Sequence, residues 1–134
     1  SRASHLKDLL HPLLSQDQNV NVHESGLNTE ETILPTCDLI INTTPLGMTP
    51  ECDNSPTQST TWCHQNQIIY DTIYTPEKTQ WCQQCEKKGA TICNGLGMLI
   101  GQGVLSYELF TGQEADPTLF KSGIEAILWK KKIW

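Results

Sequence analysis

A chain of 134 residues with a formal net charge of −6 is long enough for one small domain. Its acidic balance argues against a nucleic-acid or anionic-membrane surface, and no apolar run approaches the roughly 20 residues that a membrane helix needs. The chain begins at Ser1 without an initiator methionine or the apolar core of a signal peptide. We therefore expect a piece of a longer protein.

Apolar residues in the first third of the chain recur at helical and then at strand spacing. Leucines at helical intervals predict an amphipathic helix over 4–15, although Pro12 interrupts the pattern. A short strand is predicted over 19–23. Residues 24–36 are polar and predict a loop, with one helical turn near 29–31.

Three further strands follow in the middle of the chain. Apolar and β-branched runs predict them over 38–42, 67–73 and 90–93, and the first run is continuous enough to be covered on both faces. Residues 49–61 are rich in Pro, Ser, Thr and Asn, which predicts a mobile loop.

Three helices alternate with and follow these strands. Pro76 is predicted at the first turn of a helix that reaches about residue 88, with Gly89 as its stop signal. A second helix is predicted over 96–110, and Pro117 opens a last one that reaches about Lys130. Strands alternating with helices predict an α/β fold, in which a parallel sheet of about four strands carries helices on both faces.

Polar groups follow each of the three central strands, where ligands bind in parallel sheets. They are Asn42, Thr43 and Thr44 after the first, Thr72 and Tyr74 after the second, and Asn94 and Gly95 after the third. We expect them to form one site. Gln102 lies in the apolar run that follows, where a buried amide needs a partner. A ligand hydroxyl or the backbone could supply that partner, and the nearby glycines could serve ligand approach or tight packing.

Three segments carry a family resemblance: 38–48 (DLIINTTPLGM), 68–79 (IIYDTIYTPEKT) and 94–102 (NGLGMLIGQ). In this order and spacing they resemble the carboxy-terminal part of shikimate dehydrogenase. The resemblance implies an incomplete Rossmann-like doubly wound sheet. Residues 1–134 would then be a partial NADP-binding domain with carboxy-terminal helices.

The resemblance also implies roles for individual residues. Tyr74 and Gln102 would face the substrate, shikimate or 3-dehydroshikimate, to whose hydroxyls both side chains can hydrogen-bond. Arg2 would be a remnant of the segment that clamps the 2′-phosphate, although a terminal arginine is commonly just solvated. Asp71 is interpreted as a brace for its loop. The residues expected along NADP are Arg2, Asn42, Thr43, Thr44, Thr72, Gly95 and Met98.

Two parts of the family pattern do not occur in the 134 residues: the glycine-rich diphosphate loop and the catalytic lysine–aspartate pair of the substrate domain. No catalytic residue is therefore expected here, and the isolated chain is expected to be inactive and weakly stable. The resemblance implies that the whole enzyme would be cytoplasmic and a monomer or homodimer. It would reduce 3-dehydroshikimate with NADPH in aromatic amino-acid biosynthesis.

Two alternatives stay open at this point. A quinate dehydrogenase shares the fold and most of these motifs. A non-catalytic interaction module could instead be stabilised by zinc through Cys63, His64, Cys82 and Cys85. Reduced, packed cysteines are the simpler interpretation, because no second C-x-x-C pair occurs.

Overall fold

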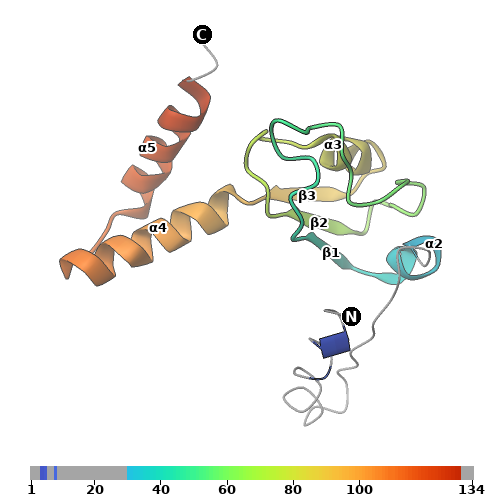
Figure 1. The fold of residues 1–134 in the computed structure, drawn as a ribbon, viewed down its shortest axis with the longest axis horizontal. Helices are drawn as coiled ribbons and strands as arrows, with labels where there is room; N and C mark the ends of the chain where they lie inside the picture. The colour runs from blue at the N-terminus through green and yellow to red at the C-terminus, as the bar shows by residue number, and fades with distance from the viewer. Residues whose placement is uncertain (1–3, 6–7, 9–29, 131–134) are drawn as a thin grey trace.

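Three parallel strands form the centre of the computed structural model, which describes residues 4–5, 8 and 30–130 (Figure 1). They pair in the order β1-β2-β3, with Leu39 opposite Ile68 and Ile68 opposite Thr91. The predictions of strands over 38–42, 67–73 and 90–93 are confirmed. The strands are β1 (Leu39–Asn42), β2 (Ile68–Asp71) and β3 (Thr91–Asn94).

The chain enters the sheet through two short helices, α2 (Glu30–Ile33) and η2 (Leu34–Thr36), where one helical turn was predicted nearby. The helix predicted over 4–15 lies largely outside the described residues. The strand predicted over 19–23 and Arg2 lie wholly outside them.

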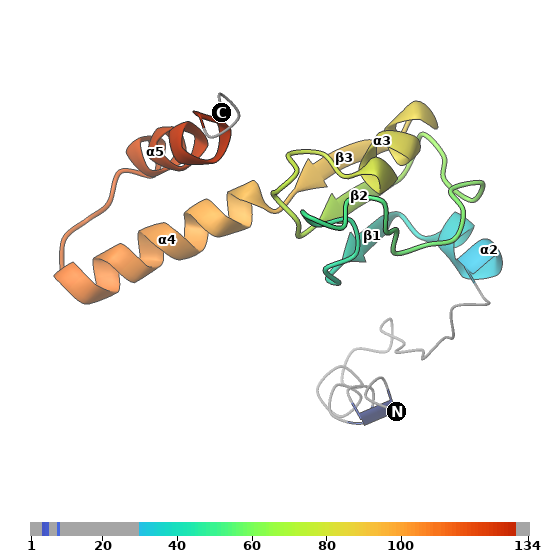
Figure 2. The ribbon, with the colours of Figure 1, turned by 45° about the horizontal axis from the view of Figure 1, so that its top comes forward.

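Two long helices follow β3, and both predictions for this part of the chain are confirmed. Helix α4 (Leu96–Thr111) leads away from the carboxyl ends of the strands, and α5 (Pro117–Lys130) turns back beside it (Figure 2). Gly112 ends α4 in the left-handed conformation, at φ 66°, which glycine adopts without steric cost. Tyr107 and Phe120 join the helices edge to face at 5.6 Å. No helix in the described ranges is long and apolar enough to span a membrane.

Helix α3 (Gln80–Lys87) begins later than predicted, so the placement of Pro76 in its first turn is wrong. The side chain of Thr79 caps the helix by accepting a hydrogen bond from the Cys82 N–H. With its cap at Thr79, the helix begins at Gln80, so the residues before Thr79, Pro76 among them, form a loop. The predicted stop at Gly89, at φ 93°, is confirmed.

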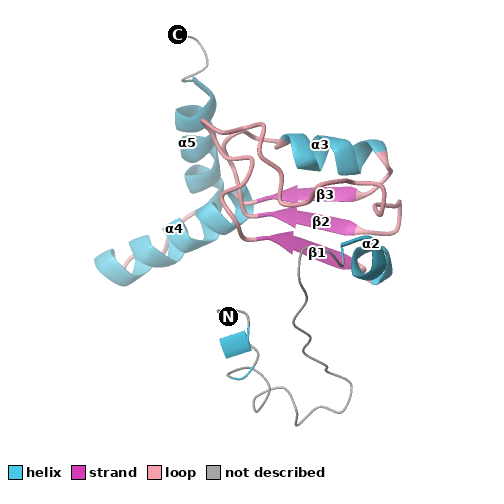
Figure 3. Ribbon diagram, turned by 45° about the vertical axis from the view of Figure 1, so that its right-hand side comes forward, coloured by secondary structure: helices cyan, strands magenta, loops and turns pink. Residues whose placement is uncertain are grey.

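The core lies between α3 and one face of the sheet, an arrangement visible in Figure 3. Trp81, Cys82 and Cys85 of α3 are buried against Ile69 of β2. The loop between β1 and β2 completes this core with Trp62, whose ring lies 6.4 Å from that of Trp81. The Trp81 indole N–H donates to the Thr57 hydroxyl, so the loop is fastened directly to the helix.

The opposite face of the sheet is exposed, and the expectation that strand 38–42 is covered on both faces is wrong for the described structure. Leu39 and Ile41 are 51% and 52% exposed, and their register neighbour Ile68 is 44% exposed. Within residues 30–130, α3 packs against the other face of the strands, with Leu34 of η2 beside the same core. The apolar face that carries Leu39, Ile41 and Ile68 has no second layer in this part of the chain.

A buried glutamine fixes the amino end of the strands. The Gln67 Nε2 donates to the carbonyl oxygens of Leu34 (2.6 Å) and Cys37 (2.9 Å), and its Oε1 accepts from the His64 N–H (3.1 Å). The side chain is fully buried. It therefore satisfies three half-buried backbone groups from the interior of the chain.

We predict that Gln67→Ala lowers the free energy of unfolding by about 2 kcal/mol, because these backbone groups lose their partner. Urea denaturation followed by tryptophan fluorescence measures the change. Gln83→Ala is the matched control: Gln83 is exposed on α3, so its loss should change the value by less than about 0.5 kcal/mol. Equal losses for the two variants would contradict this account of the core.

Candidate functional site

The carboxyl ends of the three strands are joined directly by backbone hydrogen bonds. The Thr72 N–H donates to the Asn42 carbonyl at 3.0 Å, and the Gly95 N–H donates to the Ile73 carbonyl at 3.1 Å. These bonds continue the strand pairing past Asn42, Asp71 and Asn94. Three segments far apart in the sequence therefore meet at one end of the sheet.

A cavity of about 400 Å³ opens at this junction, within the size range of small-molecule sites. Four of the predicted site residues line it: Thr43, Thr44, Thr72 and Tyr74. Sequence reasoning did not assign the remaining lining residues to the site, although each lies inside or beside the recognised motifs. They are Pro45, Met48, Thr49, Ile73 and Thr75.

Gly95 packs against the backbone of Thr72. A Cβ atom at this position would overlap the Thr72 carbonyl oxygen and lie 2.5 Å from its carbon. The backbone of Gly95 has ordinary helical angles (φ −73°), so space rather than conformational freedom requires glycine here. Added Cβ atoms at Gly97 and Gly101 would meet nothing within 4 Å, so the tight-packing interpretation does not hold for them in the described structure.

A buried carboxylate lies beneath the cavity. Asp71 is 1% exposed, and its Oδ1 accepts hydrogen bonds from Asn42 Nδ2 (3.1 Å) and from the Ile73 N–H (3.2 Å). Its Oδ2 accepts from the Thr79 hydroxyl at 2.8 Å, and the Cys82 thiol donates to the same oxygen at 3.5 Å. Asp71 therefore braces β1, the loop after β2 and the start of α3, as its interpretation as a brace predicts.

Some polar groups around the cavity are hydrogen-bonded within the chain, and others are not. The Thr44 N–H and hydroxyl both donate to the Asn42 Oδ1, at 3.0 and 2.7 Å, so these groups are satisfied within the chain. In the described part of the chain, the hydroxyls of Thr43, Thr72, Tyr74 and Thr75 make no hydrogen bond. These four hydroxyls are available to a ligand.

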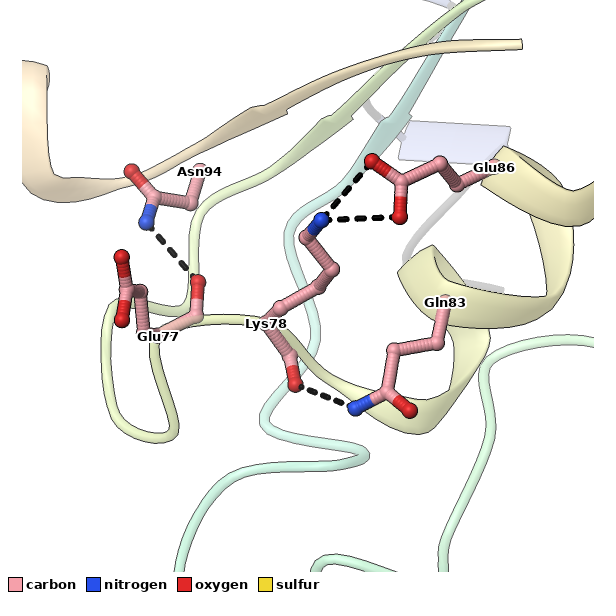
Figure 4. A network of polar contacts seen from close by, with 5 residues as sticks. All are labelled: Glu77, Lys78, Gln83, Glu86 and Asn94. Carbon is pink, nitrogen blue, oxygen red and sulfur yellow. Dashed lines mark hydrogen bonds and ion pairs between the residues drawn. The ribbon is translucent and has the colours of Figure 1, made fainter. Parts of the chain in front are cut away.

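The loop over residues 72–79, which forms one wall of the cavity, is fastened at its far end (Figure 4). The Asn94 Nδ2 donates to the Glu77 carbonyl at 2.9 Å, which ties the loop to β3. Lys78 pairs with both oxygens of Glu86 at 2.7 and 2.8 Å, and Gln83 donates to the Lys78 carbonyl at 3.1 Å. The loop is thus held between the sheet and α3.

Two predicted site residues on α4 do not line the cavity. Gln102 is exposed and Met98 is 52% exposed. The expectation that Gln102 is a buried amide is therefore wrong for the described structure, because α4 leads away from the sheet instead of packing on it. Arg2 lies outside the described residues.

The cysteines do not gather into a metal site. Within the described ranges, no three His, Cys, Asp or Glu side chains are placed to hold a metal ion. The His64 Nε2 lies 3.1 Å from the Pro35 carbonyl, and the Cys63 thiol donates to the Cys85 carbonyl. Burial raises the pKa of Cys82 to about 12 and that of Cys85 still further, so both are neutral thiols at pH 7 in the metal-free chain.

The chain is similar in sequence to known shikimate dehydrogenases. The model of the shikimate 5′-dehydrogenase C-terminal domain matches residues 95–121. Shikimate dehydrogenase (NADP(+)) of Methanococcus aeolicus is 40% identical over 115 residues, covering 86% of this chain and 41% of the relative. That of Methanopyrus kandleri is 34% identical over 113 residues, covering 83% of this chain and 39% of the relative.

Solved structures agree with these relatives. A shikimate dehydrogenase crystallised with NADP⁺ superposes with a TM-score of 0.80 at 31% identity, over 92% of this chain and 42% of that one. The Listeria monocytogenes shikimate 5-dehydrogenase, in complex with shikimate and NAD, gives 0.66 at 26% identity, over 73% of this chain and 34% of that one.

The sheet, the cavity at its carboxyl end and these likenesses define part of a Rossmann-like dehydrogenase domain, which confirms the predicted fold class. The chain belongs to the shikimate dehydrogenase family and corresponds to the carboxy-terminal portion of its members. It spans about two fifths of the length of the curated relatives that it matches.

We predict that Gly95→Ala separates β3 from the residues after β2, because its methyl group overlaps the Thr72 backbone. The melting temperature should fall, and the amide resonances of residues 72–74 should shift. Gly97→Ala is the matched control, since open space surrounds Gly97 and alanine favours the helix by up to about 1 kcal/mol. A melting temperature unchanged by Gly95→Ala would contradict this packing.

We predict that iodoacetamide at pH 8 modifies the native chain at the exposed Cys93 well before Cys82 or Cys85. With a pKa of about 12, only roughly one Cys82 side chain in 10⁴ carries the reactive thiolate at this pH. Peptide mass spectrometry over a time course measures the order. Modification of Cys82 as fast as Cys93 would contradict the buried placement of α3.

Proposed function

We propose that this chain forms the carboxy-terminal wall of an NADP-dependent shikimate dehydrogenase. The enzyme would reduce 3-dehydroshikimate to shikimate, in the service of aromatic amino-acid biosynthesis. The convergence of Asn42, Thr72 and Gly95 at one end of the sheet carries the proposal, because it brings the three family motifs together there. Residues of the first two motifs line a small-molecule cavity at this end of the sheet. The names of the relatives support the choice of cofactor and substrate.

The chemistry of the cavity suits the nicotinamide end of the cofactor. A carboxamide both donates and accepts hydrogen bonds, and the free hydroxyls of Thr43 and Thr72 can do the same. Asn42 and Thr44 would act by holding the shape of the wall, since their polar groups are bonded to each other. The bound cofactor supplies the hydride, and these residues bind and orient it.

The substrate side of the proposal rests on Tyr74. Its side chain is 37% exposed and lines the cavity, so its hydroxyl is available to a polyhydroxy ring. Gln102 and Met98 stay predictions, because they lie on α4 beyond the cavity. Four further expectations also stay predictions. They are the role of Arg2 at the 2′-phosphate, the assignment of residues 1–134 as a partial NADP-binding domain, the cytoplasmic location, and the monomeric or homodimeric state.

We predict that NADP⁺, added to the ¹⁵N-labelled 134-residue chain, shifts the amide resonances of residues 43–44, 72–74 and 95. Thr72→Val should raise the dissociation constant by roughly three- to tenfold, because one hydrogen bond to the ligand is lost. Shikimate, added to the NADP⁺-loaded chain, should then shift the amide of Tyr74. Quinate in place of shikimate tests the alternative substrate.

Thr91→Val is the matched control for this titration, because Thr91 lies at the opposite end of β3 on the exposed face. It should leave the dissociation constant unchanged. Shifts confined to α5, or an equal loss for the two threonine variants, would overturn the placement of the cofactor at the strand ends.

A further inference from the structure

The Asp71 carboxylate has a structural consequence for the cavity beyond its role as a brace. A carboxylate only accepts hydrogen bonds, so the Asn42 side chain must turn its NH₂ group toward it. The Asn42 Oδ1 is thereby directed the other way, toward the N–H and hydroxyl of Thr44. Asp71 thus sets the orientation of an amide whose two ends would otherwise be interchangeable.

The same carboxylate acts on the second edge of the cavity. Its Oδ1 also accepts from the Ile73 N–H at 3.2 Å, between the lining residues Thr72 and Tyr74. One oxygen atom therefore holds the loop after β1, through Asn42, and the loop after β2 directly. Its partner Oδ2 is held by the Thr79 hydroxyl, which keeps the carboxylate from rotating.

We propose that Asp71 is a positioning residue for the nicotinamide-nucleotide site. It fixes the turn at Thr44 through the Asn42 amide and the turn at Ile73 by direct contact, and so sets the spacing of the two cavity edges. This inference rests on the proposed function for the identity of the ligand. The hydrogen-bond geometry that carries it does not depend on any ligand.

Hydrogen exchange measured by NMR separates this role from a merely stabilising one. In Asp71→Ala, exchange at the Thr44 and Ile73 amides should rise by roughly tenfold relative to the Ile69 amide of the strand ladder. Asp71→Asn should restore most of the protection, since its amide oxygen can face Asn42 while its NH₂ donates to the Thr79 hydroxyl. In an Asn42→Ala background, Asp71→Ala should add nothing at Thr44.

Gln67→Ala is the control for general destabilisation, because Gln67 is buried directly before β2, whose other end is Asp71. It should leave the ratio of Thr44 to Ile69 exchange at the wild-type value. An unchanged ratio in Asp71→Ala, or an equal rise at every amide, would overturn the proposal.

If Asp71→Ala does not fold, hydrogen exchange of the wild-type chain in increasing denaturant tests the proposal instead. One carboxylate holds both turns, so the Thr44 and Ile73 amides should show the same dependence of exchange on denaturant, and independent openings would overturn the proposal.

NADP⁺ titration of the same variants separates the two proposals. Weaker binding by Asp71→Ala, with wild-type binding by Gln67→Ala, supports the positioning role. Equal binding by wild type and Asp71→Ala overturns that role and leaves the proposed function standing. A third outcome is that Thr44 and Ile73 of the wild-type chain exchange as expected, but NADP⁺ shifts no amide resonance. This result overturns the proposed function and leaves the hydrogen-bond network standing.

Discussion

The buried carboxylate of Asp71 is the interaction on which the described structure depends. Removing an ionised group from water is costly unless several donors replace the lost solvation. Here the donors are the Asn42 amide, the Ile73 N–H, the Thr79 hydroxyl and the Cys82 thiol. They come from β1, from the loop after β2 and from the start of α3. Hydrogen bonding to this one carboxylate therefore fixes the positions of three parts of the chain relative to one another.

This constraint connects the core to the cavity. Thr79 both donates to Asp71 and caps α3, so the helix that buries Trp81 begins where the carboxylate is held. On the other side, Gly95 brings the start of α4 against the Thr72 backbone. The wall that would receive the nicotinamide is therefore built from backbone contacts and from a buried network. This leaves the hydroxyls of the cavity wall for recognition, among them those of Thr43, Thr72 and Tyr74.

Local patterns in the sequence predict much of this arrangement. The apolar runs locate all three described strands, and Gly112 and Pro117 mark the end of α4 and the start of α5, because these signals act within a few residues. The first two recognised motifs locate the cavity, because parallel strands bring their carboxyl ends together. The start of α3 is missed because Pro76 and Thr79 are competing signals, and the side-chain cap prevails.

Local sequence patterns do not predict the features that depend on tertiary packing. The apolar residues Leu39 and Ile41 predict a covered face, but burial needs a second layer that the described helices do not supply. Gln102 lies in an apolar segment, yet the direction of α4 decides its exposure. The pairing of Asp71 with Asn42 is likewise set by strand register, and its contacts with Thr79 and Cys82 by the placement of α3, which a single sequence does not reveal.

Intermolecular nuclear Overhauser effects between NADP⁺ and the chain test the central claim most directly. The account predicts contacts from the nicotinamide ring protons to the methyl group of Thr72 and to the Hα protons of Gly95, at the junction of the strand ends. Contacts confined to the exposed sheet face around Ile41 and Ile68 would contradict it.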